Sequence, residues 1–548
     1  MENKWSEYGI VSVVGILVGV CLGIVCLNVG SLPSDILEEE WKWMYMCYTI
    51  SFIGVAMLII IFPKVLKDYL PVAATWMFVI LGFIEAIWGI RQVYGFTYSN
   101  HSLYALTGSF YNPGPYSGYL AMIFPVCLYE WLKRKDEKKK IPYYIAFVVM
   151  LLILCVLPAG MSRSAWIAAA VSSAYVCGMH YRPEIKNYIK HNRKMTMRFA
   201  IIGFLLAGIA LGGIYQIKKD SADGRLFMWK IAIHAVCERP WTGYGWNSVP
   251  AAYGQAQEVY FAAGNYTATE ELVAGAPEYV FNEYLQAAIA WGIPVLCIGL
   301  LIIGGSMYAG HKQGIYGLCS AILSLAVFAF SSYPLQFPAF VSALVMLVFA
   351  CGIRALPLQK VWFRFVFAVL LLAGSYGCFR QYQQKRKTAE VCRQWNKSRV
   401  FYQSGAYLQA IESYAEIYED MKWNARYMFE YGHALHKSHQ PEASNVVLKE
   451  ALKVSGDPMI LNIIGKNEQE MKNYESAEHW LMRAVYRLPG RIYPYYLLAN
   501  LYAEPDFFNR DKLEKMVQTV LVKEPKVQST AIKQMRRKAK DLLEKKKE

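Results

Sequence analysis

Long apolar segments dominate the first 380 residues of this 548-residue chain and constrain its fold more than any other feature. Only helices and closed barrels satisfy their backbone polar groups inside a bilayer. About eleven runs approach the roughly 20 apolar residues that a spanning helix needs. They lie near residues 9–30, 43–63, 70–90, 114–132, 141–158, 163–180, 198–216, 284–308, 313–331, 337–353 and 362–379. The pattern predicts an all-α, polytopic membrane bundle.

The composition agrees with this class and excludes others. Hydrophobic residues make up 55% of the chain and charged residues 18%, which excludes a disordered or collagen-like chain. The 12 cysteines lie mostly inside apolar runs and no Cys-x-x-Cys occurs, so we expect no disulfide scaffold, no metal and no redox cofactor. In a membrane protein, the net charge of +16 indicates topology rather than nucleic-acid binding.

Basic residues gather in every second loop between the predicted spans, and the positive-inside rule assigns these loops to the cytoplasm. Those in or beside these loops include Lys64, Lys67, Lys133, Arg134, Lys135, Arg182, Lys186, Lys190, Arg193, Lys312, Arg354, Lys360 and Arg364. The N-terminus is therefore predicted to be cytoplasmic. An odd number of spans then places the long loop 217–282, and everything after residue 380, on the outer side.

Two polar segments on the outer side lead directly into predicted spans. Residues 108–115 contain Asn112 and are rich in turn formers, so a helix-entry turn is their simplest interpretation. Ser162, Arg163 and Ser164 stand at the start of another span. An arginine there can extend to the membrane interface, or its planar guanidinium and the flanking hydroxyls can bind a phosphate.

The long outer loop opens with a segment of helical character. Arg225 and Trp229 are four residues apart and would share one face of a helix. Asp223 is a candidate N-cap. An ordinary interfacial helix is the alternative interpretation. The helix is expected to end near residue 240, where glycines in the turn 241–245 let the backbone approach another segment closely.

The loop closes with polar residues that enter a predicted span. Such residues are costly in a bilayer and usually face a site or a cavity. Three of them are spaced four apart and could line one helix face, with Glu283 on a neighbouring face. The three are Glu278, Asn282 and Gln286.

The order of these motifs resembles a known family. They are Gly-Ser-Phe-x-Asn-Pro, Ser-Arg-Ser, Gly-Arg-x-x-x-Trp, Thr-Gly-x-Gly and Asn-Glu-Tyr-Leu-Gln-x5-Gly-Ile, over about residues 70–310. So arranged, they resemble the O-antigen ligase-like family of bacterial membrane glycosyltransferases. The family includes O-antigen ligases, Wzy-type polymerases and PglL-type protein O-oligosaccharyltransferases.

The resemblance implies a GT-C-like bundle in the bacterial inner membrane. It also implies transfer of a glycan from undecaprenyl diphosphate to an acceptor hydroxyl on the periplasmic face, without a cofactor or metal. Arginines then hold the diphosphate: Arg163 and Arg225 match the family positions best, and Arg91 is a weaker candidate. Their positive charge would stabilise the charge that grows on the leaving group. Further substrate contacts are expected from Asn112, Ser162, Ser164, Trp229, Asn282 and Gln286.

One position departs from the family. Many members carry a histidine directly before the asparagine of the last motif, where this chain has Phe281, which cannot act as a base. If a base is needed, Glu278 or Glu283 is the nearest carboxylate, with Asp223 as a further option. Solvated loop-edge charge is the alternative for both glutamates. His234 belongs to no motif and is expected on a helix surface.

The last third of the chain is polar, helical in pattern and repetitive. Small residues recur in two series with a step of about 33–34 residues, a period that resembles that of tetratricopeptide repeats. The series are Ala410, Ala443 and Ala477, and Gly432, Gly465 and Ala499. We expect a soluble α-solenoid of three repeats and a partial fourth over about 394–525, with a generic helical bundle as the alternative. A protein partner could bind its concave face.

These observations predict two domains, namely a membrane catalytic domain (1–380) and a periplasmic repeat domain (381–548) that ends in a basic helix. A ligase-type transferase is favoured over a Wzy-type polymerase, because a polymerase needs no protein-binding module. The acceptor would be a lipid, a glycan or a protein. A non-enzymatic transporter or scaffold is the alternative from another class. Transporters place charges near mid-membrane, whereas the polar motifs here gather at one face.

Overall fold

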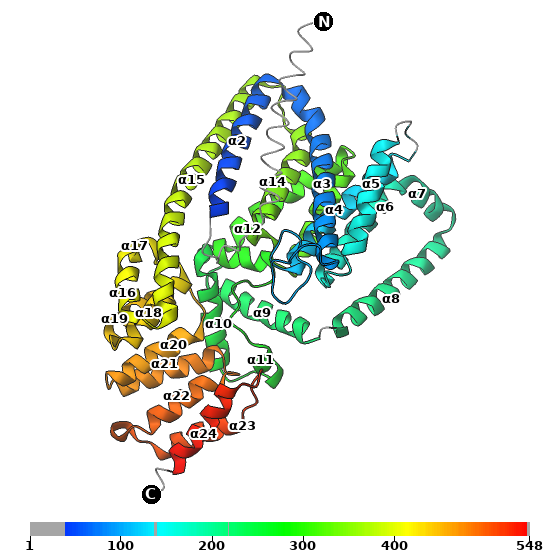
Figure 1. The fold of residues 1–548 in the computed structure, drawn as a ribbon. Coiled ribbons are helices and arrows are strands. Elements are labelled where there is room, and N and C mark those ends of the chain that lie inside the picture. Colours follow the sequence, from blue (N-terminus) through cyan, green and yellow to red (C-terminus); the bar gives the residue numbers. More distant parts are fainter. Residues whose placement is uncertain (1–38, 136, 138–139, 218, 545–548) are drawn as a thin grey trace. The chain divides into compact units, whose positions relative to one another are not determined.

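The computed structural model describes residues 39–135, 137, 140–217 and 219–544 (Figure 1). Within these residues the chain consists of α-helices, short 3-10 turns and loops, with no β-strand. The all-α prediction is confirmed. The chain forms two compact units, each made of two separate stretches of sequence. Unit 1 comprises Met1–Ile217 and Cys297–Glu390, and unit 2 comprises Lys218–Leu296 and Val391–Glu548.

Helices occupy every predicted span that falls in the described residues, while the first predicted span, 9–30, lies outside them. The helices are α2 (Glu39–Ile61), α3 (Pro63–Val93), α4 (Pro113–Lys133), α5 (Ile141–Val156), α6 (Arg163–His180), α8 (Arg193–Ile217), α12 (Glu283–Lys312), α13 (Tyr316–Ala329), α14 (Pro338–Gly352) and α15 (Val361–Ser404). The short α7 (Arg182–His191) lies between α6 and α8.

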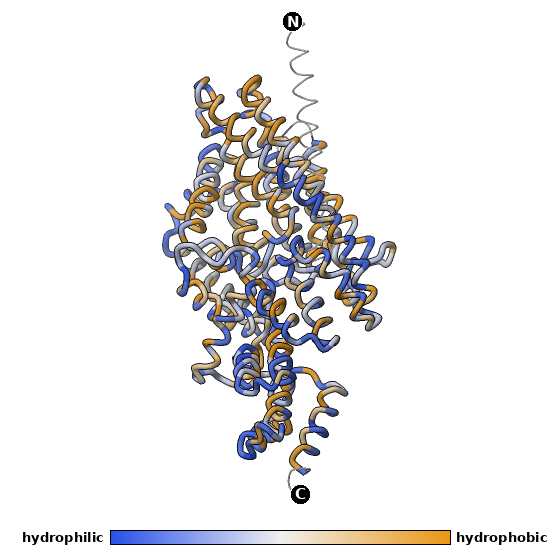
Figure 2. The backbone as a smooth tube through the Cα atoms, turned by 90° about the vertical axis from the view of Figure 1, so that its left-hand side faces the viewer, coloured by the Kyte–Doolittle hydropathy of each residue, from blue (hydrophilic) through white to orange (hydrophobic). Residues whose placement is uncertain are grey.

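Five of these helices, α2, α3, α12, α14 and α15, are long and apolar enough to cross a membrane. Two more, α5 and α13, are apolar but shorter. Hydrophobic residues predominate along the helices of the bundle, whereas hydrophilic residues alternate with them in the C-terminal helices (Figure 2). These features indicate a multi-pass membrane protein. The count of eleven spans stays a prediction.

Helix α4 lies at the centre of unit 1, packed against α3, α5, α6 and α13. Its opening is poor in apolar residues because close helix packing, rather than lipid, covers it. A Cβ on Gly118 would lie 2.2 Å from the Phe328 ring of α13. Tyr116 and Tyr119 are fully buried in the same core. The first residues of α4 therefore contact other helices of unit 1.

The first stretch of unit 2 holds the long loop. It folds into α9 (Lys219–Glu238), the 3-10 turn η1 (Trp246–Ser248), α10 (Val249–Ala262) and α11 (Ala268–Val273), and it continues into the start of α12. Apolar side chains of α9, α10 and α12 form one core, which includes Phe227, Tyr253 and Ile289.

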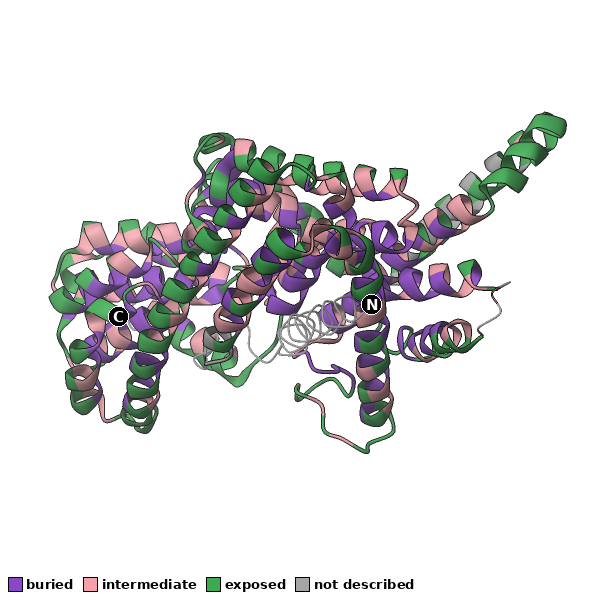
Figure 3. Cartoon of the chain, turned by 90° about the horizontal axis from the view of Figure 1, so that it is seen from above, coloured by how far each residue is buried: buried purple, intermediate pink, exposed green. Residues whose placement is uncertain are grey.

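The second stretch of unit 2 continues from the end of α15 into short helices that stack in chain order (Figure 1). They are α16 (Tyr407–Glu416), α17 (Tyr418–Met421), α18 (Ala425–Lys437), α19 (Pro441–Ala451), α20 (Pro458–Glu470), α21 (Tyr474–Arg487), α22 (Ile492–Tyr502), α23 (Arg510–Val522) and α24 (Thr530–Glu544). Buried residues line the interior of this stack and exposed residues its outside (Figure 3).

The predicted series of small residues serves close helix pairing. A Cβ on Gly432 of α18 would lie 2.5 Å from Leu448 of α19. Thirty-three positions on, Gly465 of α20 has the same relation to Leu481 of α21, at 2.7 Å. Two successive helix pairs thus pack in the same way. The assignment to tetratricopeptide repeats and the domain boundary at 380 stay predictions.

Candidate functional site

In unit 1, the loop between α3 and α4 is fixed by a buried glutamine. Gln92, beside the exposed Arg91 in the last turn of α3, is 4% exposed. Its Oε1 accepts hydrogen bonds from the backbone N–H groups of Thr107 (2.9 Å) and Gly108 (2.7 Å). Its Nε2 donates to the Gly108 carbonyl oxygen at 3.1 Å. The first motif is therefore held against the end of the helix that carries Arg91.

The rest of the first motif is equally constrained. The fully buried carboxylate of Glu85 accepts hydrogen bonds from the Ser109 hydroxyl (2.5 Å) and the Ser109 N–H (3.2 Å). Asn112 is the N-cap of α4, and its Oδ1 accepts from the Gly114 N–H at 2.9 Å. The motif is thus the helix-entry turn that the sequence indicated, and the oxygen of Asn112 is used in capping.

The Ser-Arg-Ser motif begins α6. Ser162 is the N-cap residue, Arg163 is the first residue of the helix, and Ser164 is buried in its first turn. The Ser164 hydroxyl accepts a hydrogen bond from the Ser331 hydroxyl, beyond the end of α13, at 2.7 Å. Ser164 therefore joins two helix ends. Arg163, at a helix N-terminus, stands where the helix dipole adds positive potential.

In unit 2, Arg225 and Trp229 both lie on α9, as predicted. The Arg225 guanidinium lies over the Phe281 ring, 5.3 Å from its centroid. The prediction that Asp223 caps this helix is wrong, because α9 begins at Lys219 and Asp223 falls inside it. The predicted end near residue 240 is confirmed, and His234 is exposed on the helix, as expected.

The predicted helix face of Glu278, Asn282 and Gln286 is wrong. Helix α12 begins only at Glu283, and the backbone reverses at Phe281, whose φ is +53°. Asn282 instead caps α12, because its Oδ1 accepts from the N–H groups of Tyr284 (3.0 Å) and Leu285 (3.1 Å). The preceding loop carries Glu278 in an exposed position.

Gln286 stabilises the loop that precedes α12. Its Oε1 accepts a hydrogen bond from the Val280 N–H at 3.0 Å, and the residue is 4% exposed. Glu283 is also 4% exposed, at the first position of the helix. The last motif therefore builds a hydrogen-bonded turn that contains Phe281 and the buried Glu283. A positive φ in a bulky residue is rare and is often found at functional sites.

The Thr-Gly-x-Gly motif packs against a break in α12. Gly292 interrupts the helix with φ +83° and ψ 166°. The N–H groups of Tyr244 and Gly245 donate to the Ile289 (2.8 Å) and Ala290 (2.9 Å) carbonyls, and the Ile293 N–H donates to Pro240 at 2.7 Å. The close backbone approach predicted for these glycines is confirmed, and its partner is α12.

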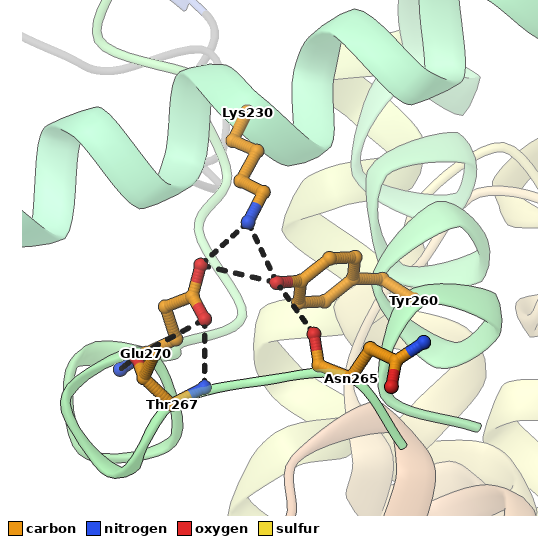
Figure 4. Close-up of polar contacts among 5 residues, drawn as sticks. All are labelled: Lys230, Tyr260, Asn265, Thr267 and Glu270. Atoms are coloured by element: carbon orange, nitrogen blue, oxygen red, sulfur yellow. Dashed lines mark hydrogen bonds and ion pairs between the residues drawn. The ribbon is translucent and has the colours of Figure 1, made fainter. Parts of the chain in front are cut away.

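A polar cluster that the motifs did not indicate ties α9 to α10 and α11 (Figure 4). Lys230 Nζ lies 2.7 Å from Glu270 Oε1 and 2.7 Å from the Tyr260 hydroxyl. Glu270 also closes a capping box with Thr267. Burial alone would raise the pKa of Glu270, but the hydrogen bonds from Lys230, Thr267 and Tyr260 lower it to about 2. Only the spatial fold reveals this cluster, because its residues are separated by up to 40 positions.

The structure groups the predicted site residues by unit. Arg91, Asn112, Ser162, Arg163 and Ser164 belong to unit 1. The unit 2 residues are Arg225, Trp229, Glu278, Asn282, Glu283 and Gln286. Arg225 and the turn at Phe281 are brought together. Among the described residues, no three His, Cys, Asp or Glu side chains gather closely enough to hold a metal ion.

Comparison with known proteins agrees with the motifs. Residues 146–300 match the family model described as O-antigen ligase. This range includes Arg163, Arg225 and the last motif, but not Arg91 or Asn112. The chain is also 24% identical over 322 residues to a general O-oligosaccharyltransferase of Acinetobacter baylyi, a match that covers 54% of this chain and 52% of that protein. The chain thus spans about half the length of that relative. The resemblance to the O-antigen ligase-like family is confirmed.

Proposed function

We propose that this chain, a membrane protein of the O-antigen ligase-like family, is a ligase that transfers a glycan from undecaprenyl diphosphate to an acceptor hydroxyl. Transfer would take place on the periplasmic face of the bacterial inner membrane. The observation that carries the proposal is the position of Arg225. The family match includes this residue, and its guanidinium is held over the turn that the last motif builds.

The proposed reaction exchanges one bond for another. The acceptor oxygen forms a bond to the anomeric carbon of the glycan, while the bond from that carbon to the diphosphate oxygen breaks. The hydroxyl proton passes to a base, and undecaprenyl diphosphate leaves with the bonding electron pair. Arg225 would bind the diphosphate oxygens and stabilise the growing negative charge. Arg163 stays a predicted phosphate-binding residue of unit 1.

Glu283 is our candidate for the base. Its carboxyl group is buried at the start of α12, directly after Phe281 and Asn282. Glu278 is exposed in the loop. A buried carboxylate can accept the acceptor's proton where bulk water does not compete. Phe281 would hold Arg225 in place rather than act as a base, because its ring has no group that accepts a proton.

Purified protein should convert an undecaprenyl-diphosphate glycan and an acceptor into glycosylated acceptor and free undecaprenyl diphosphate. Arg225→Ala should lower the rate by about 10²–10³-fold, the effect of losing one charge-stabilising group. Arg239→Ala is the matched control, because Arg239 also lies over a ring, that of Tyr244, at 4.7 Å. The control should retain most of the activity.

Three results would contradict parts of the proposal. An intact bond between glycan and diphosphate in the wild type would indicate a transporter or scaffold. A longer carrier-linked glycan, with no acceptor product, would indicate a polymerase. Full activity of Arg225→Ala would exclude this arginine from the site.

A further inference from the structure

The repeat helices and the long loop share a hydrophobic core inside unit 2. Leu488, which follows α21, is 5% exposed and packs in the cluster of Phe227 and Ile231 of α9. The same cluster contains Val280, one residue before the turn at Phe281. Helix α10 packs directly on α21. The repeats are therefore part of the structure that supports the candidate site, and not a separate module on a linker.

The contact between α10 and the loop that precedes α20 is also close enough to exclude side chains. A Cβ on Gly456 would lie 2.5 Å from the carbonyl oxygen of Pro250, and one on Gly254 would lie 2.9 Å from the Gly456 Cα. Backbone atoms cannot move aside as a flexible side chain can. Glycine at both positions lets the two stretches meet backbone to backbone.

Buried charges fix this contact. The Glu258 carboxylate of α10 lies 2.6 Å from Arg483 Nε and 2.6 Å from Arg487 Nη2, both on α21. The Glu258 side chain is 13% exposed and that of Arg487 is 3% exposed. A buried charge pair requires defined geometry, because a displaced partner leaves the other charge uncompensated.

Gln257 connects this contact to the candidate site. It is 1% exposed, and its Nε2 donates to the carbonyl oxygens of Gly275 (3.1 Å) and Arg487 (2.5 Å). Gly275 lies directly before the loop that carries Glu278 and Phe281. One side-chain amide thus joins the end of α21 to the start of the loop that leads into the turn.

We propose that α21 acts as a positioning element for the turn at residues 277–286, with Gln257, Glu258 and Arg487 as positioning residues. None of them needs to touch substrate. They fix where the turn presents Phe281, and hence Arg225, so the inference rests on the proposed function. It assigns the repeats a role in turnover that differs from capture of an acceptor or a partner protein.

The test uses the full-length protein in detergent, with two measurements on each variant. Hydrogen–deuterium exchange reports the order of residues 277–286 and does not depend on activity. The kcat and KM for the acceptor report on transfer. The variants are Gln257→Leu, Arg487→Gln and the conservative Arg487→Lys. The matched control is Glu514→Gln, which removes an exposed pair with Arg510 on α23.

Gln257→Leu and Arg487→Gln should raise amide exchange in 277–286 by about tenfold or more and lower kcat by up to about 10²-fold, the effect of a small displacement in an active site. KM should change little. Arg487→Lys should retain most of the protection and activity, because it keeps a cation beside Glu258. Glu514→Gln should match the wild type in both measurements.

Unchanged exchange at 277–286 in both Gln257→Leu and Arg487→Gln would overturn the inference, as would a rise in KM with constant kcat, which indicates acceptor capture. If the variants lost protection at 277–286 but even the wild type transferred no glycan, the positioning role would stand and only the proposed function would be contradicted. If Arg487→Gln does not fold, Gln257→Leu keeps the test decisive, because it removes two hydrogen bonds and no charge.

Discussion

Removal of Glu258 should destabilise unit 2 far more than removal of Arg487, although the two residues form one ion pair. In Glu258→Gln, two arginines lose their carboxylate, and one of them is 3% exposed. Breaking a buried pair in this way costs about 3–5 kcal/mol. Little screening by solvent applies, because the Arg487 side chain is 3% exposed and that of Glu258 is 13% exposed. Burial already lowers the pKa of the Arg487 guanidinium, despite attraction from Glu258.

The opposite change leaves the carboxylate paired. In Arg487→Met, Glu258 keeps its 2.6 Å contact with Arg483. The change also removes two buried nitrogens, Nε and Nη1, whose N–H groups donate to no acceptor within the described part of the chain. Leaving a buried donor without a partner costs about 1–3 kcal/mol. The net loss in Arg487→Met should therefore stay below about 2 kcal/mol.

The assay is thermal unfolding of each variant in one detergent, followed by tryptophan fluorescence. In a domain of 150–250 residues, 1 kcal/mol shifts Tm by about 2–4 °C. Glu258→Gln should thus lower Tm by about 6–20 °C, and Arg487→Met by less than about 8 °C. Combining Glu258→Gln with Arg487→Met should recover part of the loss, because the buried cation is gone. Equal shifts in the two single variants, or a larger shift in Arg487→Met, would refute the reasoning.

Three further results are expected. Gly292→Ala should prevent stable folding of the loop, because the added Cβ would lie 2.3 Å from a backbone oxygen and the residue has φ +83°. The control, Gly299→Ala, has open space in the same helix and should leave Tm and yield unchanged. Phe281→Asn should relieve about 1 kcal/mol of backbone strain yet slow transfer, because the ring under Arg225 is lost; an unchanged rate would exclude the ring from the site. Glu270 has a pKa lowered from 4.5 to about 2, so its stabilisation is complete above pH 4.5 and lost as the pH falls to about 2; the Tm difference between wild type and Glu270→Gln should vanish over that interval.

Hydrophobic runs predicted the helices well, because a helix that contacts lipid must be apolar along its whole length. Each described predicted span contains a helix. Helix α4 shows the limit of this signal: its first turns are covered by protein, so small and polar residues such as Gly118 replace apolar ones.

The local geometry around the predicted site residues differs from the prediction. The spacing of four residues predicted that Glu278, Asn282 and Gln286 share one helix face. Residues four apart share a face only inside a helix, and the backbone reverses at Phe281, so that α12 begins five residues after Glu278. Asp223 likewise could be an N-cap only if a helix began directly after it, whereas α9 begins at Lys219. The link from Gln257 to Arg487 spans 230 positions, and no local pattern in the sequence could indicate it.

The discontinuous make-up of unit 2 has a consequence for biosynthesis. The loop emerges from the ribosome before α13, α14, α15 and the repeats, so its apolar core stays incomplete until Leu488 has been synthesised. At 5–20 residues per second, the roughly 190 residues between Leu296 and Leu488 take about 10–40 seconds to synthesise. During that interval chaperones can bind the exposed apolar surface of the unfinished loop. A premature stop codon before α21 would leave the core of the loop permanently incomplete.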